Sequence, residues 1–106
     1  MESRIIFVDE KLKQAFAELS DRNKRLHKEI EKALNKIKFN IFCGRNIKKN
    51  LIPKILKQKY DVDNLWVYNL SKDWRLLYSV ADNEIEVLAV VLDWMDHKDY
   101  DRLFGF

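Results

Sequence analysis

Apolar side chains recur with two different periods along the 106-residue chain, and these periods predict its secondary structure. Residues Arg4–Val8 are mostly β-branched or aromatic, which is typical of a strand. Apolar positions at helical spacing follow, and with Asp9 as a cap they predict a helix from about Glu10 to Ser20. A second, stronger stripe predicts a helix that restarts at Ser20 or Asp21 and ends near Lys38; its apolar positions are Leu26, Ile30, Ala33, Leu34 and Ile37.

The C-terminal part of the chain predicts three further strands and a helix, namely Leu65–Leu70, Trp74–Ala81, Ile85–Leu92 and His97 to about Phe104. The strands are joined by two short turn sequences, Ser71-Lys72-Asp73 and Asp82-Asn83, so we expect an antiparallel meander. The third of these strands is almost continuously apolar and should be central in the sheet. Asp96 is expected to cap the last helix.

This element order, β-α-α-β-β-β-α, predicts a single α+β domain over residues 1–106. The two N-terminal helices are joined by hardly any linker and form a helical hairpin. The first strand must join the sheet after the hairpin has crossed one face, so we expect a small sheet with its helices on that side.

The segment from Phe39 to Asn64 has no clear period. Pro53 could open a short helical turn through Leu56. A connection of this length is uncommon in a small domain and is often functional. We therefore expect the functional surface here.

Charge is distributed unevenly, although the formal net charge is only +3. No Asp or Glu occurs between Lys32 and Tyr60, so this segment is strongly cationic while the remainder is acidic. Charge runs are often only solvated surface, but the lack of any interleaved acid favours a patch that attracts a polyanion. Its cations are Lys32, Lys36, Lys38, Arg45, Lys48, Lys49, Lys54, Lys57 and Lys59.

Composition narrows the class of protein. Apolar residues make up 47% and charged residues 35%, which is typical of a globular chain. The single cysteine, Cys43, excludes a disulfide scaffold and is expected to be a small buried residue. The apolar run near the N-terminus is too short to be a signal sequence or a membrane span, so we expect a cytoplasmic protein without a membrane partner.

Arg75 is the one charged residue in an otherwise apolar predicted strand. It should point to the same face as Leu77 and Ser79, away from Trp74 and its apolar neighbours. A mid-strand arginine needs an anionic partner. That partner could be Asp93 or Glu86 on the neighbouring strand, or it could be a phosphate held by the guanidinium.

His97 and Tyr100 lie one helical turn apart in the last predicted helix. A histidine suits proton transfer near neutral pH, so the pair could serve an attack by a ribose 2′-hydroxyl on the adjacent phosphate. Either side chain could equally be structural. No metal-ligand spacing occurs, and Asp96 and His97 would point apart on a helix, so we expect neither a metal site nor a cofactor.

The segments Asn64–Leu70, Trp74–Val80 and Ile85–Leu92, with the ending Asp96–Phe104, resemble the C-terminal half of RelE/ParE toxins. The ending is similar to RelE-like toxins of archaea. The predicted order of elements also matches that fold. This resemblance implies a cognate antitoxin protein as partner, and a toxin that acts either on mRNA at the A site of the 30S ribosomal subunit or on DNA gyrase.

By this resemblance, Arg75 matches the strand arginine that contacts the scissile phosphate in the ribonuclease members. His97 resembles a terminal histidine used for acid–base catalysis, and Tyr100 resembles a tyrosine that positions or stacks on the substrate. The residues expected to bind RNA are Arg45, Lys48, Lys49, Lys54 and Lys57.

Two functions remain open at this point. One is a toxin of a type II toxin–antitoxin system that cleaves mRNA as a metal-independent endoribonuclease. The alternative is a non-enzymatic, ParE-like gyrase inhibitor, or a degenerate toxin that only binds its antitoxin. The residues do not decide which group would be the general base, since a lysine, His97 or Tyr100 could each serve.

Overall fold

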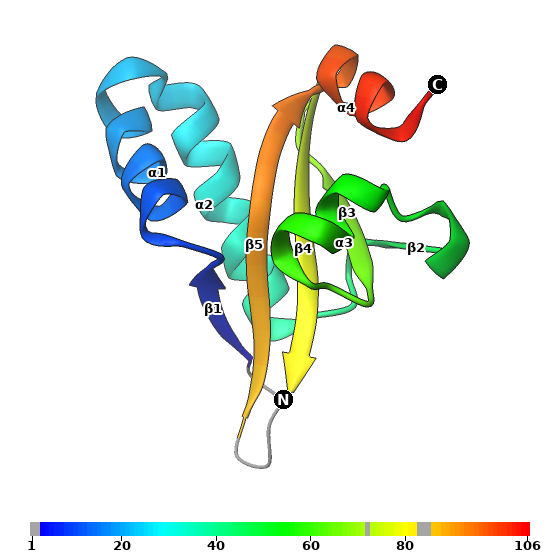
Figure 1. Cartoon of the computed structure of the whole chain (residues 1–106). Helices are drawn as coiled ribbons and strands as arrows, with labels where there is room; N and C mark the ends of the chain where they lie inside the picture. Colours follow the sequence, from blue (N-terminus) through cyan, green and yellow to red (C-terminus); the bar gives the residue numbers. More distant parts are fainter. Residues whose placement is uncertain (1–2, 72, 83–85) are drawn as a thin grey trace.

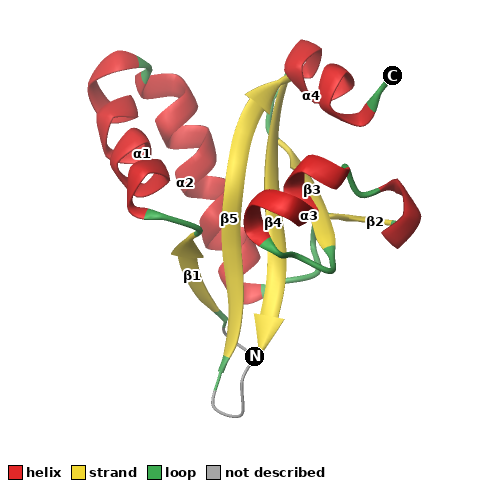
Figure 2. Ribbon diagram, in the orientation of Figure 1, coloured by secondary structure: helices red, strands yellow, loops and turns green. Residues whose placement is uncertain are grey.

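The protein, described by a computed structural model over residues 3–71, 73–82 and 86–106, has an α+β fold built on a mixed sheet (Figures 1 and 2). The described elements follow in the order β1 (Arg4–Phe7), α1 (Glu10–Arg22), α2 (Lys24–Phe39), β2 (Arg45–Ile47), the 3₁₀ turn η1 (Lys49–Leu51), α3 (Lys54–Tyr60), β3 (Leu65–Asn69), β4 (Trp74–Asp82), β5 (Val87–Asp96) and α4 (His97–Phe104). The predicted α+β class is confirmed.

The sheet has the strand order β1-β5-β4-β3-β2. Strands β3, β4 and β5 form the predicted antiparallel meander, and β1, which precedes the helical hairpin in the chain, pairs in parallel with β5 on the far side of the meander. Strand β2 was not predicted, and it extends the opposite edge by pairing with β3. The described residues do not include Lys72 and Asn83 of the two predicted turns, or Ile85, the predicted start of the last strand.

The helical hairpin α1–α2 covers one face of the sheet, here called the hairpin face (Figure 1). The predicted stripe of α2 supplies its centre, because Ile30 and Ile37 are fully buried and Leu26 and Ala33 almost so. Helix α1 has no fully buried residue and packs on the core through partly buried side chains such as Leu12 and Phe16. Burial of each large aliphatic side chain contributes roughly 1.5–3 kcal/mol, so α2 anchors this face.

Helices also cover part of the opposite face, which corrects the expectation that all helices lie on one side. Helices α3 and α4 pack there on a second core, and Figure 1 shows α3 in front of the sheet with α2 behind it. We call this the basic face. The turn predicted after Pro53 is the start of α3, which continues to Tyr60 and buries only Leu56. Asp61, in the left-handed conformation with φ of 53°, ends it.

A β-bulge separates the two halves of β5. Leu77 of β4 pairs with Asp93, but Tyr78 pairs with Val91, so Leu92 is the extra residue. A bulge resets the alternation of side chains along its strand. As a result Met95, rather than a residue of the hairpin face, lies opposite Arg75. The strand also runs to Asp96, four residues past the predicted end, and passes directly into α4.

The boundary between the first two helices differs from the prediction. Asn23 caps α2 by accepting a hydrogen bond from the backbone N–H of Leu26 at 3.1 Å, so neither Ser20 nor Asp21 restarts the helix. The Ser20 hydroxyl instead donates to the Ala17 carbonyl within α1. Serine and aspartate are both favoured as N-caps, but in this chain the N-cap of α2 is Asn23.

Candidate nucleic-acid interface

The acid-free basic segment does not form one surface. Lys32 and Lys38 of α2 line a shallow pocket beside β1, at one edge of the sheet, whereas Arg45 belongs to β2 at the other edge. Folding therefore divides the patch that the sequence suggests. The residues predicted to bind RNA all lie on the β2–α3 side and are exposed; they are Arg45, Lys48, Lys49, Lys54 and Lys57.

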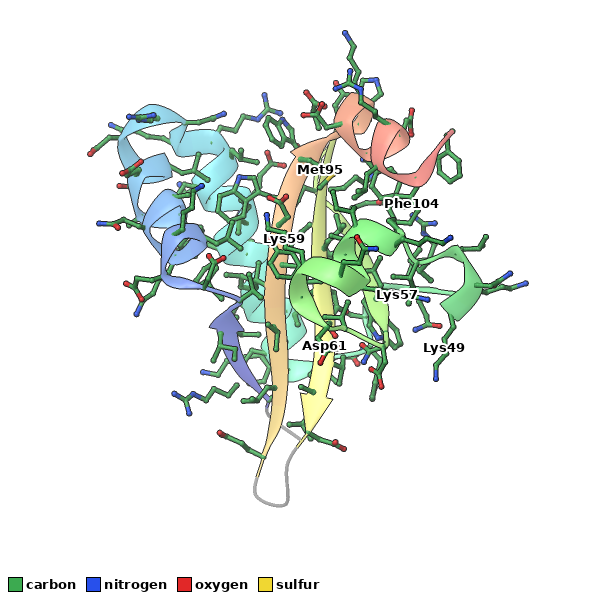
Figure 3. All side chains as sticks on the ribbon, in the orientation of Figure 1. Lys49, Lys57, Lys59, Asp61, Met95 and Phe104 are labelled. Atoms are coloured by element: carbon green, nitrogen blue, oxygen red, sulfur yellow. The ribbon has the colours of Figure 1, made fainter. Side chains whose placement is uncertain are left out.

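Figure 3 labels Lys49 and Lys57 on the same side of the molecule as Phe104 of α4. Lys59, at the end of α3, has acidic neighbours instead. Hydrogen bonding to Tyr60 raises the pKa of Lys59, and the charges of Asp93 and Asp9 raise it further. Lys59 is thus influenced by acids that other elements supply, although its own segment, residues 32–60, contains no Asp or Glu.

Arg75 lies on the basic face, as the alternation predicted. Its direct cross-strand neighbours are Asn69 on β3 and Met95 on β5, so neither Asp93 nor Glu86 stands opposite it. The guanidinium donates a hydrogen bond to the Trp74 carbonyl at 3.1 Å. Its central carbon lies 5.8 Å from the centre of the Tyr100 ring, within the range of a cation–π contact.

Tyr100 joins Arg75 to a second arginine. Arg45 Nη2 donates a hydrogen bond to the Tyr100 hydroxyl at 2.9 Å, across 55 residues of sequence. The tyrosine ring is 5% exposed and belongs to the core of the basic face, so it is held firmly. Three elements, β2, β4 and α4, thereby bring two guanidiniums to one phenol. We call these three residues, Arg45, Arg75 and Tyr100, the arginine–tyrosine cluster.

The chemistry of the cluster follows from its donors. A guanidinium presents five N–H groups and always carries a charge, and the bond to Tyr100 uses one N–H of the exposed Arg45. Because the Tyr100 oxygen accepts from Arg45, its own proton is directed elsewhere. One guanidinium bonded to the phenolic hydroxyl and a second beside the phenol ring form a site suited to an oxyanion such as a phosphate.

His97 stands apart from these contacts. It opens α4, which Asp96 caps as predicted by accepting the Asp99 N–H at 2.9 Å. His97 Nδ1 is buried and makes no hydrogen bond within the described residues, and the Asp73 carboxylate lies 3.6 Å from it. The described contacts therefore join Tyr100, and not His97, to the arginines. The ring is 43% exposed, so its accessible part is the side away from Nδ1.

Sequence reasoning missed the anchor that positions Arg45. The buried Tyr78 hydroxyl donates to the Ile41 carbonyl at 2.8 Å and accepts from the Gly44 N–H at 3.0 Å. Burial raises the pKa of Tyr78 to about 12, so the phenol stays protonated and keeps both bonds. A Cβ at residue 44 would lie 2.8 Å from that hydroxyl, which explains the glycine just before Arg45. The sequence signal that could have indicated this contact is the isolated Gly44, because such a glycine often marks a close approach to the backbone.

Cys43, beside this anchor, is exposed, which corrects the expectation of a buried residue. The Tyr78 hydroxyl bonds to the backbone of Ile41 and Gly44, and the Cys43 thiol also lies within reach of that hydroxyl. Desolvation of the thiol still raises its pKa, so the reactive thiolate is disfavoured. His27 is half-buried and stacks on Phe16 with ring centres 4.4 Å apart.

Asp93 lines a groove of about 640 Å³ between α3, β5 and α4. Desolvation raises the pKa of Asp93. The hydrogen bond that its carboxylate accepts from the Trp94 N–H at 2.9 Å and the charge of Lys59 both lower this pKa.

Among the residues that the structure describes, no three His, Cys, Asp or Glu side chains gather as metal ligands would. In the same part of the chain, no helix combines the length and the apolar character needed to cross a membrane.

Comparison with known proteins found no matching family model, no matching curated protein and no matching solved structure.

Proposed function

We propose that this protein is a toxin that binds RNA on its basic face and cleaves it at the arginine–tyrosine cluster. The observation that carries the proposal is the convergence of Arg45 and Arg75 on Tyr100, on the sheet face that also carries η1 and α3. Exposed lysines of these elements would attract the phosphate backbone, since such contacts dominate nucleic-acid affinity. The likeness to RelE/ParE toxins supports the same assignment.

The proposed reaction is a transfer within the RNA strand. The ribose 2′-oxygen forms a bond to the adjacent phosphorus, and the bond from phosphorus to the 5′-oxygen of the next nucleotide breaks. The 2′-hydroxyl gives its proton to a base, and the leaving oxygen takes one from an acid. Negative charge gathers on the phosphate in the transition state, where two preorganised guanidiniums stabilise it.

Tyr100 is the residue of this cluster that could exchange a proton with the substrate, because its hydroxyl is bonded to Arg45 and its ring lies beside Arg75. His97 begins the same helix one turn earlier and is the second candidate for proton transfer. Arg45 gains a role beyond RNA attraction here, since it contacts Tyr100 directly. The partners expected with this function are mRNA on the ribosome and a cognate antitoxin protein.

The test is primer extension on mRNA after expression of the protein in growing cells. Wild type should arrest growth and produce cuts in phase with codons, whereas Arg75→Ala should lower cleavage by about 100-fold, the usual effect of removing one charge-stabilising donor. Arg25→Ala is the matched control, because Arg25 is an exposed arginine on α2 that pairs with Glu29. It should cleave as wild type does.

Other outcomes would replace this proposal. Growth arrest with intact mRNA and altered DNA supercoiling would select a gyrase inhibitor. Neither arrest nor cleavage would select a degenerate toxin that only binds its antitoxin. Full cleavage by Arg75→Ala would remove the arginine–tyrosine cluster from the reaction.

A further inference from the structure

The chain after α4 folds back toward the arginine–tyrosine cluster. Gly105 adopts the left-handed conformation with φ of 79° and ends the helix. The Phe106 N–H then donates to the Asp101 carbonyl at 2.8 Å, and the Gly105 N–H donates to the Arg102 carbonyl at 3.3 Å. This pattern is a Schellman motif, which fixes the direction of the residue that follows the glycine.

The motif sets Phe106 against two other rings. Its ring centre lies 5.9 Å from that of Phe104, with 24° between the planes, and 6.3 Å from that of Tyr100. Tyr100 and Phe104 are themselves 4.5 Å apart. Three aromatic rings therefore gather at the C-terminal end of α4, and the innermost belongs to the arginine–tyrosine cluster.

Phe106 differs from its two neighbours in exposure. It is 82% exposed, the highest value among the large apolar side chains that the structure describes as exposed, whereas Tyr100 is 5% exposed. A single exposed apolar side chain needs no explanation by itself. This one is held by backbone hydrogen bonds, leaves most of its ring open, and is one ring away from two guanidiniums.

We propose that Phe106 is a stacking platform for an unpaired nucleobase of the strand whose phosphate binds at Arg45 and Arg75. Charge identifies the phosphate side of this ligand and the open ring identifies its base side, so the ligand is a single-stranded nucleic acid. Every base has a face that can stack on an aromatic ring, and larger bases stack more strongly. Phe106 therefore favours a purine next to the bound phosphate.

Both parts of the proposed ligand site border Tyr100. Arg75 lies 5.8 Å from the centre of the Tyr100 ring, and the Phe106 ring centre lies 6.3 Å from the same point. The phosphate and the base would thus both bind next to a single buried side chain. This inference rests on the proposed function, because it takes the arginine–tyrosine cluster to be the phosphate site.

The test is fluorescence anisotropy with a short, labelled, 2′-O-methylated RNA rich in adenine, which binds but has no free 2′-hydroxyl to react. Phe106→Ala should weaken binding by roughly 5- to 150-fold, the equivalent of losing one stacked base at about 1–3 kcal/mol. Phe106→Trp should retain wild-type binding. Phe39→Ala is the matched control, since Phe39 is 60% exposed but belongs to α2, and it should change binding less than two-fold.

A second probe separates stacking from any other effect of the substitution. Single abasic nucleotides are placed in turn along the same RNA. At the position that stacks, the abasic probe should weaken wild-type binding and leave Phe106→Ala unaffected, since that variant has nothing further to lose. Two results would rule out the stacking platform. In one, Phe106→Ala binds every abasic probe more weakly than wild type does, by the same factor at each position. In the other, Phe106→Ala binds the intact strand as tightly as wild type does.

The two proposals fail in different ways. If wild type binds the strand and Arg45→Ala or Arg75→Ala weakens binding, while Phe106→Ala does not, the phosphate site stands and the stacking inference falls. If the wild-type protein binds neither single-stranded nor double-stranded RNA, both the proposed function and the stacking inference are wrong.

Discussion

The two faces of the sheet are built in different ways. The hairpin face is covered by the long helix α2, whose apolar stripe is almost completely buried against β4 and β5. The basic face is covered by the short helices α3 and α4, each with a single fully buried residue, Leu56 and Tyr100. The hairpin face thus supplies most of the helical packing, while the basic face leaves cations and aromatic rings accessible.

The difference separates stability from recognition. Site residues on a rigid sheet can be held accurately, and the elements that carry them need little burial of their own. Here Arg75 is held by β4, whose other side is fixed by the hairpin core. We therefore expect substitutions on the hairpin face to act mainly on stability, and substitutions on the basic face to act mainly on binding.

The largest effect on stability is expected from Ile30→Ala in α2. Ile30 is fully buried, so its truncation removes apolar contacts and leaves a cavity. The free energy of unfolding should fall by about 2–5 kcal/mol, measured by urea denaturation. Ile55→Ala on α3 is the control on the basic face, because Ile55 is 57% exposed and should lose less than about 0.5 kcal/mol. Equal losses at the two positions would contradict the comparison.

A smaller effect is expected from Tyr78→Phe, which links the two faces. The Ile41 carbonyl and the Gly44 N–H would lose their partner, at a cost of about 1–3 kcal/mol in the free energy of unfolding. Phenylalanine has almost the same shape, so the core should stay packed. Because Gly44 precedes Arg45, the variant should also bind RNA more weakly. An unchanged stability would show that water replaces the lost partner.

The same residue predicts a dependence on pH. Burial raises the pKa of Tyr78 from 10.0 to about 12, so the folded state holds the phenolic proton more tightly than the unfolded state. This contribution to stability is complete below pH 10 and is lost as the pH rises toward 12. The free energy of unfolding is measured against pH for wild type and for Tyr78→Phe. The difference between the two proteins isolates the contribution of Tyr78, because the lysines that titrate in the same range are present in both. A difference that stays constant between pH 9 and 12 would argue against it.

The smallest effect is the coupling between Arg45 and Tyr100. A double-mutant cycle with Arg45→Ala and Tyr100→Phe should give an interaction energy of about 0.5–1.5 kcal/mol in unfolding free energy. The pair Arg25 and Glu29 in α2, whose charged atoms are 3.9 Å apart and whose arginine is exposed, serves as the comparison and should couple more weakly. Additive effects of Arg45→Ala and Tyr100→Phe would mean that the bond is absent in solution.

Local patterns predicted the elements well where a single face of the chain is buried. The stripe from Leu26 to Ile37 gave α2, and the alternation in β4 placed Arg75 on the correct face. Strand β2 and most of α3 were missed because they are short, and because their stability comes from pairing with β3 and packing of Leu56 rather than from a local period. The pairing of Arg45 with Tyr100 spans 55 residues, and no local pattern encodes it.

The sequence by itself determined the α+β class, the helical hairpin, the meander and an acid-free cationic segment, since all of these follow from side-chain periodicity and from charges counted along the chain. Only the tertiary structure decided that the cationic segment is divided between two edges of the sheet, that helices cover both faces, and that Arg45 and Arg75 meet at Tyr100. The physical reason is that these features depend on which distant segments lie side by side, and that is set by strand pairing and core packing, which act across the whole chain.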